Sequence, residues 1–167
     1  KYTACDGYGD YRELCARPDI DGVIIATPNH WHALNAVEAA RNGKDIYLEK
    51  PLARTIGEGQ AIVRAVRRYD RILQVGSMQR SDTAFHHACE LVRNGRIGKV
   101  QTVNVNVGGP PEEDYLAEEP VPEGLDWDRW LGPCAWRPYS SVLCPPTSWD
   151  GWARWRYYRD YAGGSMT

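Results

Sequence analysis

Short apolar runs alternate with helical patterns through the first 77 residues, and this alternation limits the fold more than any other feature of the chain. The predicted strands are residues 23–26, 45–48 and 71–75. Helical stripes rich in alanine and valine separate them, with short connections on either side. Successive strands joined by helices form parallel sheets with right-handed crossovers. The sequence therefore predicts an α/β fold with a parallel sheet, in which the continuous apolar run at 23–26 is buried on both faces.

Capping residues mark where the helices begin and end. A short helix is predicted over residues 11–16. The first crossover helix is expected to stop at residues 42–43, where Asn-Gly is a common C-terminal signal. The second begins with a capping box, in which the Thr55 hydroxyl and the Glu58 carboxylate each accept a free backbone N–H. This second helix is expected to bury Ile62, Val63, Val66 and Tyr69.

A second kind of structure is expected to begin between residues 77 and 82. The helix that follows has an apolar face and ends at residues 94–95, and residues 100–107 alternate valine with polar residues. This period of two is typical of an antiparallel strand with one wet face. The stretch 109–148 is rich in proline and too long for a plain connector. We interpret it as an excursion on the substrate side.

Charge and hydropathy argue against several classes of partner. The net charge of −2 gives no electrostatic reason to expect nucleic acid or an anionic membrane surface. No apolar run approaches the roughly 20 residues of a membrane helix, and no signal peptide is visible. The cysteines are odd in number and have no CxxC spacing, so they are interpreted as reduced thiols, with a Cys134–Cys144 bridge left open. We expect neither a nucleic-acid nor a membrane partner.

Polar residues follow each of the three predicted strands, at the edge where a parallel sheet binds its ligands. After the first strand, Thr27 is small enough to let a ligand approach closely. Pro28 and Asn29 begin a helix whose free N–H groups suit a phosphate or a ribose, although simple helix capping is the alternative. After the third strand, Gln79 and Arg80 can bind cofactor or substrate, or can hold the joint between the two domains.

The run Glu49-Lys50-Pro51, at the end of the second strand, contains the strongest candidate for direct chemistry. The Lys50 ammonium can donate a hydrogen bond to a substrate hydroxyl and stabilise charge on its oxygen while a hydride leaves the carbon. The alternative is a surface ion pair between Lys50 and Glu49, followed by a proline that starts a helix.

The histidines and tryptophans have structural alternatives to a functional role. His30 and His32 have the spacing of a metal-binding pair, but at a helix start their side chains diverge by about 200°. No further ligand follows at a suitable spacing, so no metal site is expected. His86 and His87 are expected to be structural or exposed. Six tryptophans are clustered in the sequence: Trp127, Trp130, Trp136, Trp149, Trp152 and Trp155. Most of them are expected to pack in a core or interface, and one or two are expected to face substrate.

Three segments, residues 21–32, 43–52 and 95–100, resemble the Gfo/Idh/MocA family of NAD(P)-dependent oxidoreductases, which includes glucose–fructose oxidoreductase and inositol dehydrogenase. The resemblance implies a Rossmann parallel sheet followed by an α+β domain with a mostly antiparallel sheet. On this basis residues 1–77 are the C-terminal part of a Rossmann dinucleotide-binding domain, and residues 78–167 begin a substrate and oligomerisation domain. The implied cofactor is NAD or NADP. The implied substrate is a sugar, a cyclitol or a derivative, oxidised at a hydroxyl-bearing carbon by a homo-oligomer.

The resemblance also assigns roles to the strand-end residues. Lys50 matches the family's catalytic lysine, and the bond between Lys50 and Pro51 is implied to be cis. The nicotinamide and the substrate are expected to meet at residues 49–51. With Gln79 included, the residues expected on the cofactor side are Thr27, Pro28, Asn29, His32, Glu49, Lys50, Pro51 and Gln79.

The sequence departs from the family pattern at both ends. The glycine fingerprint is not found, because Gly7-Tyr8-Gly9 lacks a preceding apolar strand. The family's general acid/base segment is expected beyond Thr167. We therefore expect an internal part of a longer protein, inactive alone and a weak binder of NAD, located in the cytoplasm or exported by bacteria. The alternatives to a dehydrogenase are an NAD-dependent glycoside hydrolase of the same fold and a non-catalytic binding relative.

Overall fold

The computed structural model describes residues 5–113 and 115–166 and contains the predicted parallel sheet. Its strands are β1 (Gly22–Ile25), β2 (Asp45–Leu48) and β3 (Leu73–Val75), paired in the order β1-β2-β3. Both pairings are parallel, with Ile25 opposite Leu48 and Leu48 opposite Val75. The predicted second strand has the observed bounds, whereas the third begins two residues later than expected. The α/β fold is therefore confirmed.

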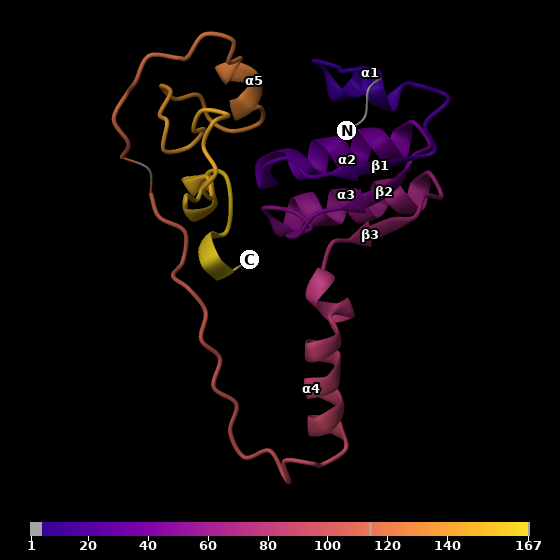
Figure 1. Ribbon diagram of the computed structural model, residues 1–167. Coiled ribbons are helices and arrows are strands. Elements are labelled where there is room, and N and C mark those ends of the chain that lie inside the picture. Colours follow the sequence, from indigo (N-terminus) through magenta and orange to yellow (C-terminus); the bar gives the residue numbers. More distant parts are fainter. Residues whose placement is uncertain (1–4, 114, 167) are drawn as a thin grey trace.

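Helices cover one face of this sheet. The short α1 (Tyr11–Cys15) precedes β1, and the crossovers are α2 (His32–Arg41) and α3 (Ile56–Arg68). A 3₁₀ turn, η1 (Asn29–Trp31), leads from β1 into α2. The capping box is confirmed, because Thr55 accepts the Glu58 backbone N–H while the Glu58 carboxylate accepts that of Thr55. In Figure 1, α2 and α3 lie side by side, in agreement with the contacts between them.

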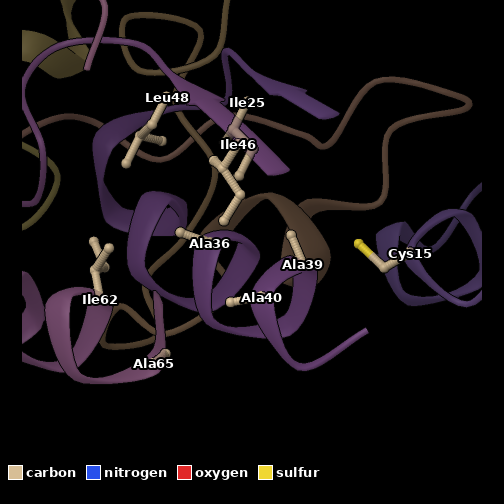
Figure 2. Packing of buried hydrophobic residues seen from close by; sticks show 9 residues of the cluster. All are labelled: Cys15, Ile25, Ala36, Ala39, Ala40, Ile46, Leu48, Ile62 and Ala65. Atoms are coloured by element: carbon tan, nitrogen blue, oxygen red, sulfur yellow. The ribbon is translucent and has the colours of Figure 1, made fainter. Parts of the chain in front are cut away.

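The first hydrophobic core lies between the strands and these helices. Figure 2 shows strand side chains such as Leu48 and Ile46 pointing toward α2 and α3. The α2 face is built of alanines, whose small side chains let the helix approach the sheet closely. Burying a leucine or isoleucine in this way contributes roughly 1.5–3 kcal/mol. The buried cluster consists of Cys15, Ile25, Ala36, Ala39, Ala40, Ile46, Leu48, Ile62 and Ala65.

Two burial predictions are wrong. The strand at 23–26 is not buried on both faces, because Ile24 is 78% exposed and Tyr47, opposite it on β2, is 37% exposed. Both crossover helices lie on the same side of the sheet, so alternate strand residues face away from every described helix. On α3, Val63 is 40% exposed, because one helical residue turns it about 100° away from the buried Ile62.

The chain leaves the sheet after β3 through the 3₁₀ turn η2 (Met78–Ser81) and the helix α4 (Thr83–Arg93). Figure 1 shows α4 projecting from the sheet, and its apolar residues, such as Phe85, are exposed. The predicted antiparallel strand at 100–107 is not formed. A strand needs a partner for its backbone groups, and no described segment pairs with these residues, so their valines are exposed.

The predicted division into domains 1–77 and 78–167 stays a prediction, and its outer limits, Lys1 and Thr167, lie outside the described residues. After β3, the described chain forms no further strand. Among the described residues after β3, an isolated parallel bridge joins Glu112 and Tyr158. The mostly antiparallel second sheet therefore also remains a prediction.

The tryptophan-rich part of the chain forms a second core. It contains the short helix α5 (Trp127–Leu131) and the 3₁₀ turns η3 (Arg154–Tyr157) and η4 (Gly164–Met166). The Trp127 and Trp130 rings stack 4.9 Å apart, and the Tyr139 ring meets Trp127 edge-on. Its buried residues, called the tryptophan cluster below, are Trp127, Leu131, Tyr139, Leu143, Trp155, Tyr158, Tyr161 and Ala162.

Hydrogen bonds join the segments around the tryptophan cluster to the segments after β1 and β2 and to Gly9, before α1. The Trp130 carbonyl accepts from His30 Nε2 at 2.9 Å and from Trp31 Nε1 at 3.1 Å. Arg129 donates to the Gly9 carbonyl at 2.6 Å, and Arg54, beyond β2, donates to the Asp160 carbonyl. These links span about a hundred residues of sequence. They place the second core over the sheet edge where ligands bind in α/β folds.

Cys134 and Cys144 are both free thiols, so the disulfide between them that the sequence left open is not formed. Burial raises the pKa of Cys134 to about 11. The described part of the chain contains no helix with the length and apolar character needed to cross a bilayer.

Candidate functional site

A cavity of about 420 Å³ lies between the carboxyl ends of the strands and the tryptophan cluster. Its volume falls within the range of small-ligand sites, roughly 300–1,000 Å³. One wall comes from the segments after β1 and β2, and the opposite wall comes from η2, η3 and the C-terminal turn. The first wall consists of Ala26, Thr27, Asn29, His32, Glu49, Lys50 and Pro51. The second consists of Met78, Trp152, Trp155, Arg156, Ala162 and Gly164.

The two strand-end segments of the first wall are tied together by His32. This buried ring contacts the Thr27 carbonyl through Nε2 at 2.9 Å and the Pro51 carbonyl through Nδ1 at 2.8 Å. Carbonyl oxygens only accept, so the neutral imidazole satisfies one of them, and the imidazolium satisfies both. His32 therefore lines the cavity but has no ring nitrogen left for a ligand. It holds the segment after β1 against the segment after β2.

Glu49 and Lys50 lie at the mouth of β2 with separate surroundings. The Glu49 carboxylate packs over Gly76, where an added Cβ would lie 3.1 Å from it, and it accepts the Lys50 backbone N–H at 3.3 Å. The ion pairs of the described residues do not include one between these two side chains. This favours an ammonium available to a ligand over a closed surface pair. The bond from Lys50 to Pro51 is cis, as the resemblance implied.

Thr27 separates this cavity from a neighbouring hollow of about 510 Å³, to which it also contributes. Its hydroxyl oxygen accepts from Asn35 Nδ2 at 3.1 Å, which leaves the hydroxyl hydrogen able to donate to a ligand. The Asn35 Oδ1 atom is buried and has no hydrogen-bond partner among the described residues. Pro28 and Trp31 line this neighbouring hollow rather than the cavity of about 420 Å³ that contains Lys50, which is called the Lys50 cavity below.

The second wall is aromatic and carries one cation. The Arg156 guanidinium lies 4.7 Å from the Trp152 ring centre and 4.5 Å from that of Trp155. Burial lowers the pKa of Arg156. Trp155 is buried while Trp152 is 78% exposed, so the first packs in the core and the second faces the cavity mouth. Such contacts between a cation and aromatic faces order both rings before any ligand arrives.

The structure brings together most, but not all, of the predicted site residues. Thr27, Asn29, His32, Glu49, Lys50 and Pro51 share the cavity described above. Pro28 faces the neighbouring hollow, and Gln79 lies in a separate hollow beside α4 with Phe85 and Cys89. The functional roles of all eight residues remain predictions. Sequence reasoning missed Met78 and Arg156, and the only signal for the second wall was the clustering of tryptophans.

The two histidines of the predicted pair diverge, as expected for a helix start. His30 donates to the Trp130 carbonyl and is 1% exposed, and burial lowers its pKa to about 4. Its Nδ1 atom has no hydrogen-bond partner among the described residues. Within residues 5–113 and 115–166, no group of three or more histidine, cysteine, aspartate or glutamate side chains has a metal-binding arrangement.

Comparison with known proteins supports the assignment of the sheet. Residues 1–77 match the sequence profile of the Gfo/Idh/MocA family, an oxidoreductase family with an NAD-binding Rossmann fold. The scyllo-inositol 2-dehydrogenase (NAD(+)) of Bacillus subtilis (strain 168) is 38% identical over 107 residues, which are 62% of this chain and 31% of that protein. The levoglucosan dehydrogenase of Pseudarthrobacter phenanthrenivorans is 37% identical over 118 residues, which are 71% of this chain and 29% of that protein.

A solved structure, the myo-inositol 2-dehydrogenase from Lactobacillus plantarum, matches with a TM-score of 0.52 and 29% identity, over 56% of this chain and 28% of that chain. The chain spans about a third of the length of the first curated relatives it matches. The family match contains all three strands and ends just before η2. It therefore includes the first wall of the cavity and none of the second.

Proposed function

Because residues 1–77 match the profile of the Gfo/Idh/MocA oxidoreductase family, we propose that the protein carrying this chain transfers a hydride between NAD or NADP and a hydroxyl-bearing carbon. The substrate class we propose is a sugar, a cyclitol or a derivative. The scyllo-inositol and levoglucosan dehydrogenases support this class, since both relatives cover most of the chain. The observation that carries the proposal is the meeting of Thr27, Glu49 and Lys50 in one cavity at the carboxyl ends of adjacent parallel strands.

The chemistry of the first wall fits a nucleotide cofactor and a polyhydroxylated substrate. A carboxylate on Glu49 accepts hydrogen bonds from ribose or sugar hydroxyls, whereas the Thr27 hydroxyl and the Lys50 ammonium donate to their oxygens. Donors and acceptors are therefore both present in the cavity, as a ligand with many hydroxyls requires. The carboxyl ends of parallel strands are also where open α/β sheets bind dinucleotides.

Lys50 is the residue that we assign to the reaction itself. NAD, when bound, supplies the hydride acceptor. The Lys50 Nζ atom donates a hydrogen bond to the oxygen of the reacting carbon and stabilises the charge that changes on this oxygen during the transfer, while the hydroxyl proton passes to a general base of the protein that carries this chain. His32 keeps Lys50 in place indirectly, through the Pro51 carbonyl that it bonds.

The second wall makes the interaction of Lys50 with the substrate stronger. Trp155, Arg156 and Met78 line the same cavity as Lys50 and would exclude part of the water around a bound substrate. A hydrogen bond from an ammonium is stronger where water does not compete for it, because the local dielectric constant is lower. The proposal also includes a homo-oligomer, for which the exposed apolar side chains of α4 offer contact surface.

The proposed function is tested by replacing Lys50 with methionine in the protein that carries this chain. NADH formation is followed with scyllo-inositol and with levoglucosan as substrates. Loss of an oxyanion-stabilising donor reduces kcat by about 100- to 1,000-fold, so Lys50→Met should fall in this range. The matched control is Lys99→Met, an exposed lysine outside the cavity, which should keep the parental rate. Full activity of Lys50→Met, or glycoside cleavage without net NADH, would contradict the proposal.

A further inference from the structure

A further hollow, of about 400 Å³ and distinct from those of Pro28 and Gln79, shares a lining residue with the Lys50 cavity. Trp152 lines both spaces, so one indole ring lies between them. The remaining lining includes Pro145, Pro146, Trp149 and Arg154. These residues form a groove of flat apolar faces with one guanidinium beside it, called the Trp149 groove below.

The two tryptophans of the Trp149 groove are open to solvent, as Trp136 is outside it. Trp149 is 60% exposed and Trp152 is 78% exposed, whereas Trp127 and Trp155 are buried in the tryptophan cluster. A large exposed aromatic surface with polar neighbours is typical of a binding site. The apolar C–H face of a sugar ring packs on an indole ring, while the sugar's equatorial hydroxyls remain at its edge and can reach donors such as Arg154.

Trp152 contacts a cation, and Trp149 lies close to the backbone of a glycine. The Arg156 guanidinium is stacked against Trp152, and the Trp149 indole lies over Gly151. A Cβ at Gly151 would lie 2.5 Å from Trp149 Nε1, so a residue larger than glycine would displace the ring. Rings that are ordered in advance lose little conformational entropy on binding, which favours affinity.

We propose that the Trp149 groove is a second sugar subsite, and that the substrate is a neutral glycoside or oligosaccharide of at least two rings. One ring occupies the Lys50 cavity, and the next packs on Trp152 and Trp149. This inference rests on the proposed function for the first ring, because it extends the substrate outward from the reacting carbon. It gives a role to the two exposed tryptophans that line the groove.

The test measures binding of an array of neutral di- and trisaccharides and their constituent monosaccharides to the protein and to two variants. The test variant is Trp149→Ala. The matched control is Trp136→Ala, which removes an exposed tryptophan whose Nε1 donates to Asp128 outside the groove. At least one oligosaccharide should bind about 10-fold more tightly than its monosaccharide, and Trp149→Ala should remove this difference. Trp136→Ala should preserve it.

The proposal is overturned if no oligosaccharide binds more tightly than its monosaccharide, or if Trp149→Ala leaves oligosaccharide affinity unchanged. Its failure is distinguishable from failure of the proposed function. Lys50→Met tests NADH formation from a single ring and does not alter the groove. Loss of turnover in Lys50→Met together with unchanged oligosaccharide binding in Trp149→Ala would leave the oxidoreductase standing and remove only the second subsite.

Discussion

His30 makes the attachment of the tryptophan cluster to the sheet sensitive to acid. Its Nε2 hydrogen bonds to the Trp130 carbonyl, and its ring packs between Trp130 and Tyr161 with centroid distances of 5.2 and 5.4 Å. Protonation would place a second N–H on Nδ1, which is buried and has no partner among the described residues. Nearby Arg54 opposes a further positive charge. The folded protein therefore prefers neutral His30.

The size of the effect follows from the lowered pKa of His30. Burial lowers this pKa from 6.5 to about 4, so unfolding takes up a proton between these values. The contribution of neutral His30 is complete above pH 6.5 and is lost as the pH falls toward 4. Since one pKa unit corresponds to about 1.4 kcal/mol, the free energy of unfolding should fall by about 2 kcal/mol between pH 7 and pH 5 from this residue.

Urea unfolding followed by tryptophan fluorescence measures this loss, because the tryptophans lie in the cluster that His30 attaches. In His30→Gln the amide can still donate to the Trp130 carbonyl but does not titrate, so its loss between pH 7 and pH 5 should be about 2 kcal/mol smaller. His86→Gln, on the exposed face of α4, is the matched control and should behave like the parent. Equal pH dependence of the parent and His30→Gln would refute the reasoning.

Two further predictions test the core and the site. Ile62→Ala should lower the free energy of unfolding by 2–5 kcal/mol, whereas Val63→Ala on the exposed side of α3 should change it by about 0.5 kcal/mol or less; equal urea midpoints would contradict the observed face. Gly76→Ala should displace the Glu49 carboxylate and weaken NADH binding about 10-fold with little loss of stability. An unchanged dissociation constant would show that Glu49 does not hold the cofactor.

The parts of the fold that could be predicted are those set by neighbouring residues. The strand over 45–48 and the capping box of Thr55 and Glu58 depend on apolar runs and local hydrogen bonds, and both were predicted correctly. Burial of Ile24 was not, because it depends on which face of the sheet the helices cover. The alternating valines of 100–107 predict strand character, but a strand forms only where another segment pairs with it.

The candidate site also has a part that the sequence predicts and a part that depends on distant contacts. Thr27 and Lys50 could be placed together because parallel strands bring their carboxyl ends to one edge. The opposite wall, with Arg156 and the two cavity tryptophans, depends on contacts about a hundred residues apart in sequence, such as those of His30 and Trp31 with Trp130. No periodic pattern encodes such contacts. The composition indicated aromatic packing, but it did not indicate which rings face the cavity.

The most direct test of the central claim, that cofactor and substrate meet at the mouths of β1 and β2, is an NMR titration of the ¹⁵N-labelled chain with NADH. This measurement detects weak binding, which suits the low affinity expected from the sequence. The account predicts concentration-dependent shifts at the backbone amides of Thr27, Asn29, Glu49 and Lys50, with α4 unaffected. Shifts confined to the hollow of Gln79 and Phe85, or no shifts at the four strand-end amides, would contradict it.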